Sequence, residues 1–162
     1  MQTAATSPFL QLIGNRTKAR LFLLRKLPAA FFSGVRIEAI SAEGCTVSVP
    51  YKWFTQNPFR STYFACLSMA AEMSAGALAM AAVYGRTPSV SLLITGMESR
   101  FLKKAISKTF FTCSEGPALQ KAADAAINTG AAQSVTVHSN GFDAAGVLVA
   151  EFSFTWSFKA KS

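Results

Sequence analysis

One carboxylate stands alone in the most apolar part of the chain. Glu72 is the single charged residue between Ser61 and Gly85, and its neighbours Ala71 and Met73 are apolar. A carboxylate in such surroundings must find a partner, reach water through a cleft, or have its pKa raised by desolvation. A raised carboxyl pKa suits general-base catalysis near neutral pH. Glu72 is therefore the first candidate for a catalytic residue.

A structural role for Glu72 is the alternative. An ion pair with Arg60 or Arg86, or a hydrogen bond to a backbone group, would satisfy the buried carboxylate. Ion pairs of this kind shift pKa values at structural sites as well as at active sites. Composition alone therefore favours the structural role.

Other catalytic arrangements have weaker support. The single histidine, His138, lies in a strand-like segment, and no nucleophile-elbow motif accompanies it. Cys66 lies on an apolar stretch that is typical of core residues. Because Cys45, Cys66 and Cys113 are widely spaced and form no CxxC motif, we expect no zinc site. We expect three buried thiols in a reducing, cytoplasmic compartment.

The hydrophobic pattern predicts the elements that position Glu72. Residues 61–85 are rich in Ala, Met and Leu and are apolar nearly all round, which predicts a buried central helix. An antiparallel sheet wrapped around this helix accommodates the remaining elements in a single α+β domain. The predicted strands are 35–41, 45–51, 90–102, 106–113, 134–139 and 146–158, with a short helix at 117–128.

Charge is concentrated at the start of the chain. Residues 1–37 carry six basic and no acidic side chains, out of a formal net charge of +8 over 162 residues. The rest of the chain is nearly neutral, which argues against a nucleic-acid-binding surface. We expect no transmembrane span, because Glu72 and Arg86 interrupt the most apolar region.

A helix is also expected at the N-terminus. Ser7 and Pro8 are typical of a helix start, and Pro28 is expected to end the helix. We expect residues 1–30 to pack as a helix on a domain formed by residues 31–162, because core-facing stripes are the commoner origin of such a pattern. Contact of this basic amphipathic helix with an anionic membrane surface is the less favoured alternative.

The segment around the lone carboxylate resembles the hotdog-fold acyl-CoA thioesterases of the phenylacetyl-CoA thioesterase type. In that family an Asn lies six residues before a His-Gly-Gly, and an acidic residue on the central helix follows nine residues after the His. At the same spacing this chain has Asn57, then Tyr63-Phe64-Ala65, then Glu72. The resemblance covers about residues 30–160 and is closest to an uncharacterised thioesterase-like branch with an extra N-terminal helix.

The resemblance implies a hotdog homodimer, or a dimer of such dimers, that hydrolyses an acyl-CoA or a related thioester. Coenzyme A would be part of the substrate, with no other cofactor and no metal. Glu72 would act as general base or nucleophile, and Asn57 would position the water or the thioester. Backbone N–H groups at the start of the central helix would hold the oxyanion. The implied substrate-binding residues are Arg60, Tyr63, Phe64, Ala65, Arg100, Lys103 and Lys104.

The chain departs from this family at the oxyanion loop. Tyr63-Phe64-Ala65 replaces His-Gly-Gly, and glycines permit close approach and backbone angles that Phe and Ala restrict. Lys103 and Lys104, expected at the coenzyme A phosphates, are equally typical of a solvated strand end. Two functions therefore stay open. One is an acyl-CoA thioesterase. The other is a non-catalytic hotdog protein that binds acyl groups, fatty acids or acyl-CoA, which its basic helix would place at a membrane.

Overall fold

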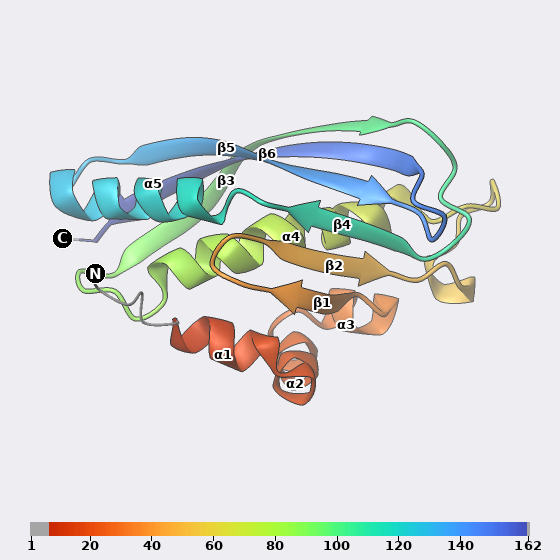
Figure 1. The fold of residues 1–162 in the computed structure, drawn as a ribbon, viewed down its shortest axis with the longest axis horizontal. Helices are drawn as coiled ribbons and strands as arrows, with labels where there is room; N and C mark the ends of the chain where they lie inside the picture. The colour runs from red at the N-terminus through yellow and green to blue at the C-terminus, as the bar shows by residue number, and fades with distance from the viewer. Residues whose placement is uncertain (1–6, 162) are drawn as a thin grey trace.

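One long helix lies at the centre of the molecule, with one sheet wrapped around it (Figure 1). The structure is a computed structural model that describes residues 7–161. Helix α4 (Phe64–Val83) packs against a six-stranded antiparallel sheet in the order β1-β2-β4-β5-β6-β3. The strands are β1 (Arg36–Ile40), β2 (Cys45–Val49), β3 (Val90–Phe101), β4 (Thr109–Cys113), β5 (Gln133–Phe142) and β6 (Leu148–Ala160). The predicted strands and the predicted central helix are confirmed.

Helix α4 is a core helix. Ala70, Ala71, Ala75 and Ala79 have no exposed surface, because small side chains let the strands approach the helix closely. By length and hydropathy α4 could also cross a membrane, but 67% of its most apolar window is buried inside the domain. Burial within the domain accounts for its apolar composition.

Strand β6 supplies the opposite wall of the core. Its alternating Phe152, Phe154, Trp156 and Phe158 are all buried, as the alternation predicts. Helix α5 (Gly116–Thr129) closes the core with Leu119, Ala123 and Ala126. The sequence and the structure therefore agree on which faces of these elements are apolar and buried.

The three cysteines are buried and free, as expected. Cys45 and Cys113 lie opposite each other on β2 and β4. Burial raises the pKa of Cys45 to about 12 and that of Cys113 to about 11. Because the thiolate is the reactive form, we expect the thiols of Cys45 and Cys113 to be unreactive in the native protein.

The N-terminal segment is not the single helix that the sequence predicts. It consists of α1 (Pro8–Gly14), α2 (Arg16–Lys26) and α3 (Pro28–Ser33), and residues 1–6 lie outside the described range. Asn15 breaks the helix because its backbone is extended and its side chain accepts a hydrogen bond from the Lys18 N–H, which caps α2. Pro28 begins α3, consistent with the preference of proline for a first helical turn.

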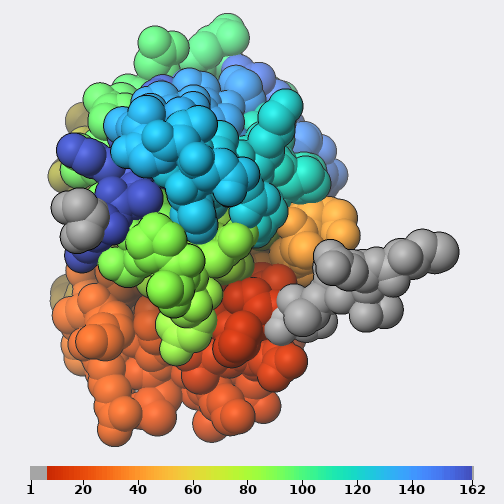
Figure 2. All heavy atoms as spheres, turned by 90° about the vertical axis from the view of Figure 1, so that its left-hand side faces the viewer, coloured from red at the N-terminus to blue at the C-terminus, as the bar shows by residue number. Residues whose placement is uncertain are grey.

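Helix α1 packs beside β1 and the last turns of α4, α2 packs on β1, and α3 packs on α4. Phe9 and Ile13 of α1 and Leu23 of α2 are almost fully buried. Figure 2 shows the N-terminal helices below, α5 above, and the end of α4 between them. The N-terminal helices are therefore held on the domain through these buried side chains.

Candidate active site

A groove of about 590 Å³ opens where α4 begins and β3 ends. Its walls come from the loop before α4, the first turn of α4 and the segment after β3. Of the residues that the sequence predicts for the site, the groove brings together Asn57, Tyr63, Phe64, Lys103 and Lys104. Two lysines therefore lie beside a groove that is mostly aromatic and apolar.

Asn57 organises the loop that forms one wall. Its Oδ1 accepts hydrogen bonds from the Phe59 N–H at 3.0 Å and from the Ser61 N–H and hydroxyl, each at 3.2 Å. Its Nδ2 donates to the Thr62 carbonyl over 3.5 Å, a weak bond. The carbonyl end of Asn57 is thus used by the loop, and the second hydrogen on Nδ2 has no acceptor among residues 7–161.

Hydrogen bonds join this loop to the segment after β3. The Thr62 N–H and hydroxyl both donate to the Ala105 carbonyl, at 2.8 and 3.0 Å. Lys104 Nζ donates to the Phe59 carbonyl at 3.2 Å. Lys104 therefore holds the loop as well as lining the groove. The Lys103 N–H donates to the Val149 carbonyl at 3.2 Å, but its side chain makes no hydrogen bond within the described part of the chain.

The first turn of α4 offers two backbone donors. Tyr63, the N-cap residue, gives no side-chain cap, and its carbonyl accepts from the N–H groups of Cys66 and Leu67. The N–H groups of Phe64 and Ala65 have no acceptor within residues 7–161. Free N–H groups at a helix N-terminus carry partial positive charge and can bind an anionic oxygen. The predicted oxyanion position therefore has donors at the expected residues.

Glu72 has no ion pair among the described residues. Arg86, one predicted partner, instead binds Asp124 at 2.5 Å and the Ala82 carbonyl at 3.1 Å. Arg60 is exposed in the loop, with a left-handed φ of 59°. The structure gives no support to the structural ion pair that composition alone favoured.

The carboxylate of Glu72 lies over Gly76, one helical turn further along. A Cβ at Gly76 would come within 2.5 Å of Glu72 Oε1 and 3.4 Å of the Trp156 ring. The glycine therefore makes room for the carboxylate beside the indole. Desolvation raises the pKa of Glu72, and no neighbouring charge offsets it.

A half-buried strip of α4 connects the groove with Glu72. Ala65, Ser68, Met69 and Glu72 follow the i, i+3, i+4, i+7 spacing of one helix face, and all four are partly exposed. Glu72 does not itself line the groove. It lies about 12 Å along the helix axis from Phe64, given the usual rise per residue.

The remaining predicted residues lie outside the groove lining. Arg100 forms an ion pair with Glu151 at 3.3 Å and is exposed. Arg60 and Ala65 also lie outside the lining. Sequence reasoning missed Leu67, Phe101 and Leu102, which do line it. Phe101 follows directly after Arg100 at the end of β3. The hydrogen bonds from Thr62 to the Ala105 carbonyl bring the loop before α4 and the segment after β3 together, and such long-range contacts leave no local pattern in the sequence.

A family model, described as a domain of unknown function (DUF4442), matches residues 17–158. No curated protein matches the chain. Among solved structures, protein PA5026 of Pseudomonas aeruginosa, described as a probable thioesterase, is 18% identical, with a TM-score of 0.76 over 93% of this chain and 99% of that one. Thioesterase HI1161 of Haemophilus influenzae is 16% identical, with a TM-score of 0.62 over 86% of this chain and 88% of that one.

The PaaI protein of the E. coli phenylacetic acid degradation operon has a similar fold as well. It is 11% identical, with a TM-score of 0.65 over 98% of this chain and 97% of that one. These three likenesses, like the topology of Figure 1, establish the architecture rather than the activity. The chain belongs to the DUF4442 family and has the hotdog fold, the architecture that it shares with these structures.

Proposed function

We propose that the protein hydrolyses an acyl-CoA thioester, with Glu72 as the residue that activates water. The observation that carries this proposal is the half-buried carboxylate of Glu72, which has no ion pair among the described residues. It lies on the same helix whose uncapped first turn forms part of the groove. The thioesterase-like relatives supply further support, at the level of the fold.

The proposed reaction follows from the groups present. The Glu72 carboxylate takes a proton from water as the water oxygen attacks the thioester carbonyl carbon. The N–H groups of Phe64 and Ala65 stabilise the oxyanion that develops. Because these groups lie about 12 Å along α4 from Glu72 of the same chain, a second copy of the chain would supply them. The carbon–sulfur bond then breaks, and coenzyme A leaves as a thiol after receiving the proton. Direct attack by Glu72 through an acyl anhydride, which water then hydrolyses, is the other route for the same carboxylate.

Asn57 and the lysines would serve binding. Nδ2 of Asn57 has one free hydrogen, which can be donated to the thioester carbonyl, while its Oδ1 holds the loop in place. Lys103 lines the groove and is exposed, so that it can reach a coenzyme A phosphate. Tyr63 and Phe64 supply an apolar wall against which the pantetheine arm or the acyl chain can pack.

A second copy of the chain would complete the site. Met97 and Phe101 of β3 pair with Phe154 and Ala150 of β6, and cross-strand partners point to the same face of a sheet. Phe154 and Ala150 are fully buried, yet Met97 is 53% and Phe101 is 47% exposed. The inner face of β3 beside the strip of α4 is thus uncovered, and a homodimer contact there would enclose the path from the groove to Glu72.

Thiol release from a panel of short, long and aromatic acyl-CoAs tests the proposal. We expect turnover of at least one class, and a loss on the order of 10² to 10⁴-fold in kcat for Glu72→Gln. Glu43→Gln is the matched control, because Glu43 is exposed in the β1–β2 turn. Wild-type turnover that survives Glu72→Gln would contradict the role of this residue.

A non-catalytic acyl-CoA-binding protein is the second candidate. It is favoured by the distance between Glu72 and the groove, and by Tyr63-Phe64-Ala65 where glycines occur in the catalytic family. Saturable binding of acyl-CoA without thiol release, by a protein of verified fold and oligomeric state, would establish this alternative and overturn hydrolysis.

A further inference from the structure

Helix α2 buries only part of its apolar surface. Ala19 and Leu23 face the domain, whereas Leu21 and Leu24 are exposed on the opposite side, and Leu27 follows directly after the helix. Each of these exposed leucines has more than 40% of its surface accessible. Single exposed leucines are ordinary on protein surfaces, but a contiguous apolar patch marks an interaction site.

Side-chain contacts continue this surface across α3 to the 3₁₀ helix η1 (Trp53–Thr55). The Arg20 guanidinium lies 3.9 Å from the ring centroid of Phe31, which packs edge-on against Phe32 at 5.3 Å. Lys52 Nζ donates to the Phe32 carbonyl at 3.4 Å and lies 6.0 Å from the ring centroid of Phe54. Elements that are distant in the sequence therefore form one continuous surface.

The aromatic end of this surface is strongly exposed. Trp53 is 82% and Phe32 is 58% exposed. In Figure 1, α3 and the coil of η1 lie at the same end of the molecule. Exposed tryptophan and phenylalanine beside lysines are typical of protein surfaces that rest at a membrane–water interface. We call this surface the apolar ridge, and define it as Leu24, Leu27, Phe32, Trp53 and Phe54.

Basic side chains border the apolar ridge without acidic ones between them. Arg25, Lys26 and Lys52 are exposed beside it. In the sequence, the ridge residues lie within two stretches, 1–37 and 44–71, that contain no Asp or Glu. The ridge therefore complements an anionic partner. A second copy of the chain would set like charges against each other across a twofold contact, which disfavours a dimer here.

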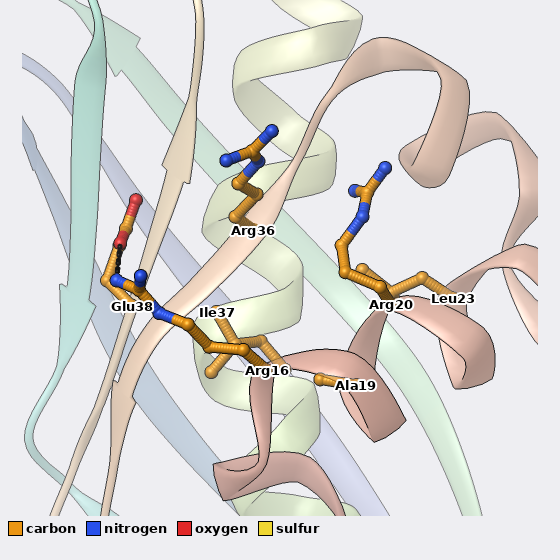
Figure 3. Close-up of a pocket in the computed structure, with 7 residues that line it drawn as sticks. All are labelled: Arg16, Ala19, Arg20, Leu23, Arg36, Ile37 and Glu38. Atoms are coloured by element: carbon orange, nitrogen blue, oxygen red, sulfur yellow. Dashed lines mark ion pairs between the residues drawn. The ribbon is translucent and has the colours of Figure 1, made fainter.

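A small hollow beside α2 adds two more cations. It measures about 200 Å³ and lies between α2 and the start of β1. Figure 3 shows the guanidinium groups of Arg20 and Arg36 extended to the same side, while Arg16 reaches toward Glu38 at 3.7 Å. Burial, and then the neighbouring Arg36, lower the pKa of Arg20. The Arg20 guanidinium also donates to the Val35 carbonyl at 3.2 Å, and its remaining N–H groups and those of Arg36 can bind phosphate oxygens.

We infer that the apolar ridge docks on a bilayer that contains anionic phospholipids. Trp53, Phe54 and Phe32 enter the interfacial region, and the basic side chains around them meet the lipid phosphates. Helix α2 packs on β1 and α3 packs on α2, and β1 is the sheet edge opposite β3, so that docking leaves the uncovered face of β3 accessible.

Vesicle binding tests this inference with a built-in probe. The chain has two tryptophans, and Trp156 is buried, so that a change in emission reports on Trp53. Vesicles of phosphatidylcholine with phosphatidylserine should shift the emission to the blue at low salt, and pure phosphatidylcholine should not. Trp53→Phe should abolish the shift. High salt should weaken binding, because the attraction is electrostatic in part.

Paired variants separate the ridge from net charge. Arg25→Gln together with Lys26→Gln should weaken cosedimentation with the anionic vesicles on the order of tenfold. Lys121→Gln together with Lys159→Gln removes the same charge from exposed sites elsewhere and should change binding less than about twofold. Leu24→Ser together with Leu27→Ser should weaken vesicle binding, because the double variant has less apolar surface to bury in the bilayer. Unchanged circular dichroism is the control for folding.

Three outcomes would overturn the inference. One is a wild-type protein that stays unbound to anionic vesicles at low salt. Another is an equal loss of vesicle binding in both pairs of charge variants, which would show that binding depends on net charge alone. The third is a change of oligomeric state in the leucine variants without loss of vesicle binding, which would assign the ridge to a second copy of the chain.

Discussion

Glu72 is held in a place where its charged form is disfavoured. Its carboxylate lies over Gly76 beside the Trp156 ring, and desolvation raises its pKa. A folded-state pKa above the unfolded-state pKa means that this residue adds stability while it is protonated and loses that contribution as the pH rises through the folded-state pKa. At neutral pH the ionised side chain therefore lowers the free energy of unfolding.

Replacing the carboxylate should stabilise the protein at neutral pH. We expect Glu72→Gln to raise the free energy of urea unfolding at pH 7, and we expect the gain to disappear below about pH 4, where Glu72 is protonated in both states. Glu43→Gln should not stabilise, because the Ser41 hydroxyl lowers the pKa of that carboxyl. A Gln variant at position 72 that is less stable than wild type at pH 7 would show that Glu72 has a stabilising partner.

Gly76 should act as a positioning residue for Glu72. In Gly76→Ala the new Cβ would displace the carboxylate, whose flexible end can move, so that the helix should remain intact and gain up to about 1 kcal/mol of helix propensity. We expect kcat for the best acyl-CoA to fall at least tenfold without a drop in Tm. In the Glu72→Gln background the same substitution should cost no further activity. Full activity in the single variant would contradict this arrangement.

Among the helices and strands, the sequence predicted those in which buried residues recur at regular intervals along the chain. The alternation from Phe152 to Phe158 and the apolar run around Ala70 located β6 and α4, because burial on a strand or helix repeats along the chain. The break at Asn15 was missed, since a single capping side chain interrupted an otherwise helical pattern. The spacing of apolar residues along a helix carries no information about such a local cap.

Only those residues of the candidate site that belong to a local sequence motif could be predicted. Asn57 and Glu72 were found by their spacing, but the groove also needs the contact between Thr62 and Ala105, which lie 43 residues apart. Long-range hydrogen bonds of this kind leave no periodic trace in a single sequence. The ion pair between Arg86 and Asp124 was missed for the same reason, although it is what leaves Glu72 without Arg86 as a partner.

The loop before α4 should depend on the acceptor of Asn57. Asn57→Ala removes the acceptor for three hydrogen bonds and should lower the free energy of unfolding by about 1–3 kcal/mol, with a loss of kcat/KM. Asn57→Asp keeps an acceptor oxygen and removes the amide donor. We expect near wild-type Tm but reduced kcat for this variant, because the free Nδ2 hydrogen is proposed to contact the thioester. Unchanged stability and kinetics in Asn57→Ala would contradict both roles.

For the molecule as a whole, part of the inner face of β3 is exposed, whereas a closed single-chain domain would bury it. Met97 lies on the face that should meet a second copy, and Leu93 lies on the same strand with 64% of its surface exposed. We expect Met97→Arg to convert dimers to monomers in light scattering and to abolish activity, because an unpaired charge would be buried at the contact. Leu93→Arg, the control, should remain dimeric and active. A dimer unaffected by Met97→Arg would place the contact elsewhere.

The most direct test of Glu72 as the base is the pH dependence of kcat/KM for the best acyl-CoA in the wild type and in Glu72→Gln. We predict a wild-type acidic limb with a midpoint above the ordinary pKa of a glutamate, since desolvation raises the pKa of Glu72 and only its ionised form accepts a proton. The Gln variant should lose most of its activity and also lose that limb. A Gln variant with wild-type kcat/KM and an unchanged acidic limb would contradict the role of Glu72 as the base.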